Sequence, residues 1–97
     1  MTRGEALKKL GELLPTVKAR YDVDEIFIFG SVARDEAAST SDIDVLVDFR
    51  GPATFERFMG LKLFLEDEFG VRVDLVTRRA LRPRMKPQIE AEAVRVA

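Results

Sequence analysis

The chain has 97 residues, a net charge of −1, 46% hydrophobic residues and 34% charged residues. These values predict one ordinary globular domain, residues 1–97, without the charge excess that favours nucleic acid or an anionic membrane. The absence of cysteine and histidine excludes disulfides, zinc–thiolate sites, thiol nucleophiles and the usual imidazole base. Any chemistry must use carboxylates, hydroxyls, Lys and Arg, and oxygen ligands favour Mg²⁺ or Mn²⁺. Since no apolar run could span a bilayer and no signal peptide is visible, we expect a cytoplasmic protein.

Helices are predicted from apolar residues at helical spacing. The first covers residues 4–20, with Pro15 positioned to kink it. A short helix is expected at 31–36, followed by a loop at 37–41. A longer helix at 54–69 has Thr54 as its N-cap and Gly70 as its C-terminal stop. The basic and then mixed tail, 81–97, is expected to end in a helix after Pro87.

Strands are predicted from short apolar and β-branched runs. There are three of them, at residues 25–29, 42–49 and 71–76. The second strand alternates, so Ile43 and Val45 point to the core while Asp42 and Asp44 point the other way. Helices and strands therefore alternate along the chain, which predicts an α/β or α+β domain with one small mixed sheet of three to four strands.

Gly30 and Ser31 lie between the first strand and a short helix. A glycine there lets the backbone approach a ligand closely, and free N–H groups with a serine hydroxyl suit a phosphate. The same pair alone would equally fit a simple turn and helix cap.

Three aspartates are the candidate metal ligands. Asp42 and Asp44 share one face of their strand, and a divalent cation would relieve their repulsion. Taken alone, they could instead form a solvated strand edge. Asp74 interrupts an apolar strand, where a carboxylate is costly unless it is paired or metal-bound. If its strand neighbours the second one, it completes a three-carboxylate cluster; the alternative is a salt bridge to Arg72, Arg78 or Arg34.

The combination is more specific than its parts: a strand, Gly-Ser, ten residues, Asp-x-Asp on a second strand, and a lone Asp on a third. The segments IFIFGSVARDEAASTSDIDVLVDF and VRVDLVT resemble the nucleotidyltransferase superfamily that contains DNA polymerase β. In particular, the chain resembles the minimal nucleotidyltransferase (MNT) proteins over nearly its whole length. This chain departs from the family pattern at Asp35, where the family often has glycine. The departure is mild.

The resemblance implies a nucleotidyltransferase fold and roles for the matching residues. Gly30 and Ser31 would hold the triphosphate of ATP. Asp42 and Asp44 would bind two Mg²⁺ or Mn²⁺ ions, and Asp74 would be the third carboxylate and the base for the attacking hydroxyl. Two metals can activate a hydroxyl and stabilise the departing pyrophosphate.

Other residues keep two interpretations. Arg34 could reach a phosphate, or pair with Glu36 or Asp42. The basic run from Arg78 to Lys86 is either a solvated loop or a docking surface for an acidic partner or RNA. It has no interleaved aromatics, so direct nucleic-acid binding is not favoured. Three apolar residues fit either a core or an interface: Phe49, Phe55 and Met59.

Three functions are compatible with the sequence. The MNT resemblance implies an antitoxin that binds a HEPN-type toxin, a helical ribonuclease, and adds AMP to one of its tyrosines. The second is a binding module with a vestigial site, although the intact motif argues against it. The third is a transferase that acts on a small molecule. The weakness of this hypothesis is that no acceptor-binding domain is recognisable in these 97 residues. Each requires a nucleoside triphosphate or a partner that the motif alone does not identify.

Overall fold

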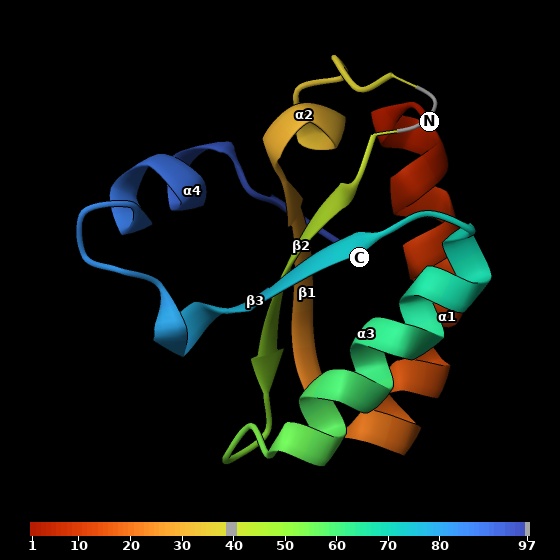
Figure 1. Ribbon diagram of the computed structural model, residues 1–97, viewed down its shortest axis with the longest axis vertical. Helices are drawn as coiled ribbons and strands as arrows, with labels where there is room; N and C mark the ends of the chain where they lie inside the picture. The colour runs from red at the N-terminus through yellow and green to blue at the C-terminus, as the bar shows by residue number, and fades with distance from the viewer. Residues whose placement is uncertain (39–40, 97) are drawn as a thin grey trace.

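Residues 1–38 and 41–96, which the computed structural model describes, form a four-stranded sheet with helices on both faces (Figure 1). The helices are α1 (Arg3–Tyr21), α2 (Gly30–Ala33), α3 (Phe55–Phe69) and α4 (Lys86–Glu92). The strands are β1 (Val23–Phe29), β2 (Ile43–Phe49), β3 (Val73–Thr77) and β4 (Val94–Arg95), and a 3-10 turn, η1 (Arg78–Ala80), follows β3. The predicted α/β domain with a small mixed sheet is confirmed.

The strand order is β3-β2-β1-β4, with β1 antiparallel to both β2 and β4 and with β2 parallel to β3. A parallel pair needs a crossover connection, and α3 supplies it. Its ends follow the sequence prediction: Thr54 accepts a hydrogen bond from the Arg57 amide, and Gly70 ends the helix at a φ of +70°. This crossover brings β3 beside β2, which decides where Asp74 lies.

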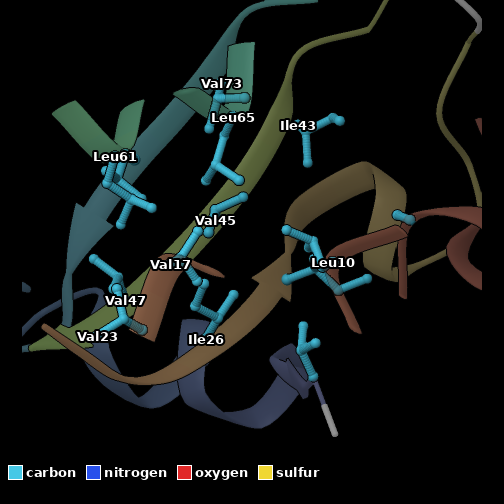
Figure 2. Packing of buried hydrophobic residues seen from close by; sticks show 14 of the residues in the cluster. Leu10, Val17, Val23, Ile26, Ile43, Val45, Val47, Leu61, Leu65 and Val73 are labelled. Carbon is cyan, nitrogen blue, oxygen red and sulfur yellow. The ribbon is translucent and has the colours of Figure 1, made fainter. Parts of the chain in front are cut away.

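The main core lies between the sheet and the helices α1 and α3. Side chains from both helices, such as Leu10, Val17 and Leu61, meet those of Ile26 and Val45 from the two central strands (Figure 2). All five are at most 1% exposed. Burying a side chain of this size stabilises the fold by about 1.5–3 kcal/mol. This face of the sheet therefore provides most of the apolar packing between the strands and the helices α1 and α3.

A smaller cluster covers the opposite face of the sheet, on the side of α4 (Figure 1). It joins Phe29, Leu46 and Ile89, each less than 9% exposed. Ile89 comes from α4, so this cluster fixes the C-terminal helix against the two central strands. The aspartates of β2 and β3 share this face with Leu46, because side chains alternate along a strand.

The C-terminal part of the chain follows the prediction only in part. The helix expected after Pro87 is present as α4, but it ends at Glu92 and is followed by β4, which pairs with Phe27 and Ile28 of β1. Two residues are too short to show a strand pattern, so only the pairing reveals them. Pro15 lies inside α1, as predicted, and the helix continues to Tyr21; the kink at Pro15 stays a prediction. The predicted loop at 37–41 falls partly on residues 39 and 40, which lie outside the described residues.

The three apolar residues with two interpretations separate. Phe49 is buried at 5% exposure, Met59 is half-buried, and Phe55 is 78% exposed at the start of α3. Among the described residues, no helix is both long and apolar enough to cross a membrane.

Candidate active site

Two of the predicted aspartates are direct neighbours across the sheet. Asp44 of β2 pairs in register with Asp74 of β3, and with Phe29 of β1 on its other side. Asp44 is half-buried and Asp74 is exposed. Asp42 lies one residue before β2 and is also exposed. The condition for the predicted cluster, that the two strands are adjacent, is therefore met.

The three carboxylates interact through their charges. The pKa of Asp44 rises from 3.8 to about 6. Burial is the largest cause, followed by the charge of Asp74 and a hydrogen bond with it, and then by the charge of Asp42, while Arg34 acts in the opposite direction. A like charge nearby and a low-dielectric surrounding both disfavour ionisation. The site thus concentrates negative charge and favours a cation.

Asp74 does not form the salt bridge that was its alternative interpretation. Within the described part of the chain, no salt bridge links Asp74 to Arg72, Arg78 or Arg34. The same residues also contain no group of three acidic side chains already arranged to hold a metal ion. Asp44 and Asp74 are therefore a close pair, with Asp42 near enough to be felt electrostatically but not converged on the same point.

Gly30 is required for a reason that the sequence does not show. Its φ is +68°, a left-handed conformation that L side chains rarely adopt. A Cβ at this position would lie 2.1 Å from Oδ2 of Asp44. The close approach predicted for a ligand is thus made first by the Asp44 carboxylate, which lies directly against the Gly30 α-carbon. Ser31 follows, half-buried at the start of α2.

Arg34 pairs with neither Asp42 nor Asp44. Its guanidinium donates to Glu36 at 2.8 Å and to Glu92 at 3.0 Å. These two hydrogen bonds raise the pKa of Arg34. The predicted pairing of Arg34 with Glu36 is confirmed, and a contact of Arg34 with a phosphate stays a prediction.

Glu92 also belongs to this region, although the sequence alone does not indicate it. Besides Arg34, its carboxylate accepts a hydrogen bond from the Gly30 amide at 3.0 Å. Its partners are 58 and 62 residues away in the chain. Spacing within the tail carries no signal of such a contact; only the docking of α4 creates it.

A hollow of about 230 Å³ opens beside Asp74. Asp74 lines it together with an otherwise mainly apolar wall that includes Phe29, Val76, Met85 and Ile89. A group entering this hollow would come close to the Asp74 carboxylate.

The basic run divides into one structural arginine and an exposed remainder. Arg78 lies over the Phe27 ring and within 4 Å of Asp48 and Glu90. Asp48 therefore lies near Arg78 and is not part of the aspartate cluster. The side chains that follow are exposed: Arg79, Arg82, Arg84 and Lys86.

Acidic side chains on two adjacent strands offer oxygen donors of the kind that divalent metal ions prefer, and they lie beside the Gly30 turn. The family model described as nucleotidyltransferase domain matches residues 10–96 of this chain. The chain belongs to this family and is a nucleotidyltransferase.

Within the family it is similar to small members. Protein adenylyltransferase MntA of Thermococcus cleftensis is 39% identical over 80 residues, which cover 82% of this chain and 81% of the relative. A solved structure described as a putative minimal nucleotidyltransferase superposes with a TM-score of 0.80 at 41% identity, covering 97% of this chain and 95% of that one.

The fold also occurs in a toxin–antitoxin complex. A chain in the structure of tri-AMPylated Shewanella oneidensis HEPN toxin with MNT antitoxin matches with a TM-score of 0.71. The identity is 20%, and the match covers 99% of this chain and 72% of that one. At this identity the likeness concerns the fold.

Proposed function

We propose that this nucleotidyltransferase transfers AMP from ATP to a hydroxyl of a partner protein, and that the partner is a HEPN-type toxin for which it serves as antitoxin. The observation that carries the chemistry is the pairing of Asp44 with Asp74 beside the Gly30 turn. The adenylyltransferase name of a 39%-identical relative supports protein as the acceptor. The fold shared with an MNT antitoxin supports the partner.

The residues present fit divalent metal ions. Asp42, Asp44 and Asp74 offer only oxygen donors, which Mg²⁺ and Mn²⁺ prefer. Burial and the charge of Asp74 raise the pKa of Asp44, and a cation bound there would favour its ionised form. When bound, two such ions would neutralise the triphosphate and make the acceptor hydroxyl more acidic.

The chain's own groups have distinct roles in the reaction. The turn at Gly30 and Ser31 holds the phosphates, while the hollow beside Asp74 admits the acceptor side chain. The acceptor oxygen forms a bond to the α-phosphorus as the bond from that phosphorus to the bridging oxygen breaks, and pyrophosphate leaves. Asp74 takes the proton of the hydroxyl, since it lines the hollow from which the acceptor arrives. ATP and Mg²⁺ are cytoplasmic reagents, and we assign the reaction to the cytoplasm.

Intact-mass spectrometry tests this proposal. The purified protein is mixed with labelled ATP, Mg²⁺ and a candidate HEPN-type partner protein. We expect the HEPN-type protein to gain the mass of AMP with the wild type and not with an Asp42→Asn, Asp44→Asn variant. Binding of the partner by both proteins without any mass gain would favour a binding module instead. Transfer of AMP to a small molecule by the chain alone would favour a small-molecule nucleotidyltransferase.

A further inference from the structure

Glu92 connects the C-terminal helix to the nucleotide site. Its two carboxylate oxygens are both engaged, one by the Gly30 amide at 3.0 Å and one by the Arg34 guanidinium at 3.0 Å. The side chain is 23% exposed. Partial shelter and charge make these hydrogen bonds stronger than neutral bonds at the surface.

The carboxylate is held in place from both sides. Three residues before it, on the same face of α4, Ile89 is buried against Phe29 and Leu46. After Ala93 the chain enters β4, and the Val96 amide donates to the Ile26 carbonyl of β1. Glu92 is therefore part of a fixed element and not of a loose tail.

Both partners of Glu92 bear on Asp44. Gly30 leaves the space that the Asp44 carboxylate occupies, since a Cβ there would be 2.1 Å from Oδ2. Arg34 is the cation whose charge acts on Asp44. A shift of the Gly30 turn or of Arg34 would thus change where Asp44 lies and which charge it faces.

We propose that Glu92 is a positioning residue of the nucleotide site: its carboxylate bridges Gly30 and Arg34 and thereby sets the turn against which Asp44 lies. This role rests on the proposed function, in which Asp44 holds metal and the turn holds phosphate. Residues that orient such ligands typically contribute 10–100-fold to affinity or activity. Glu92 touches no reacting atom and acts through its two partners.

The test compares Glu92→Ala and Glu92→Gln with Glu90→Gln, which changes an exposed carboxylate on the same helix. The probe is a non-hydrolysable ATP analogue with Mg²⁺, titrated calorimetrically, and thermal melts establish that each variant is folded. We expect the Kd to rise roughly tenfold in Glu92→Ala. A smaller rise is expected in Glu92→Gln, which keeps an acceptor for the Gly30 amide, and none in Glu90→Gln.

Two results would overturn this role. An unchanged Kd in Glu92→Ala would leave Glu92 as a fold contact only. A lower Kd would mean that the carboxylate competes with a phosphate for the Gly30 amide.

If the wild type binds no nucleotide, the proposed function fails, but the positioning contact is still tested by amide NMR spectra. We expect the Gly30 and Asp44 resonances to move in Glu92→Ala and to stay in place in Glu90→Gln. Unmoved resonances would contradict the contact itself.

Discussion

Replacing Gly30 by alanine should separate the activity of this protein from its stability. The new Cβ would lie 2.1 Å from Oδ2 of Asp44 and 3.0 Å from its Cγ. Since the far end of a side chain can rotate away, Asp44 can relieve the overlap. Its carboxylate oxygen must then move by about 1 Å or more, and a misplacement of that size can cost roughly 100-fold in rate.

The stability cost has a different origin. An alanine at a φ of +68° is strained by about 1–2 kcal/mol, because its Cβ approaches the following carbonyl oxygen. For a domain of this size, each 1 kcal/mol lowers the Tm by roughly 4–8 °C. Gly70→Ala is the matched control: its φ is +70°, and nothing lies within 4 Å of the added Cβ.

Melting curves and AMP transfer, measured on both variants, distinguish the two effects. We expect similar losses of Tm in Gly30→Ala and Gly70→Ala, and a loss of transfer only in Gly30→Ala. Full transfer by a folded Gly30→Ala variant would refute the idea that this glycine makes room for Asp44.

Three further results are expected. The pKa of Asp44 is raised from 3.8 to about 6, so the stabilising contribution of this side chain is present below pH 3.8 and is lost as the pH rises through 6. Without divalent metal, the Asp44→Asn variant should therefore melt above the wild type at pH 7 but not at pH 4. Parallel pH profiles of the two melting temperatures would contradict this. Leu61 is fully buried, and Leu61→Ala should lose about 2–5 kcal/mol in urea unfolding; a loss below 1 kcal/mol would show that the core can close over the gap. Thr54→Ala should lose about 1 kcal/mol with its N-cap bond to the Arg57 amide, whereas Thr54→Ser should keep most of it; equal losses would argue against capping.

The sequence pattern predicted the faces of the strands well. Alternation in β2 placed Val45 in the core and Asp44 on the opposite face, and the structure confirms both. Such periodicity reflects burial, which is a local property of a strand. Whether Asp74 would lie beside Asp44 was a separate question, since strand order depends on the crossover through α3 and not on either strand alone.

Contacts between distant segments were beyond the pattern. Glu92 meets Gly30 across 62 positions, and β4 exists only because Val94 and Arg95 pair with β1. In each case the contact forms because α4 and β4 pack against the sheet. The residues of these two elements would suit an exposed tail equally well. Arg34 shows the same limit, because one of its two carboxylate partners lies on α4.

The most direct test of the aspartate site is a crystal structure with Mn²⁺ and a non-hydrolysable ATP analogue, in which anomalous scattering locates the metal. Our account predicts anomalous density between the carboxylates of Asp44 and Asp74, with the triphosphate at Gly30 and Ser31. Metal or nucleotide bound elsewhere, with these carboxylates free of metal, would contradict it.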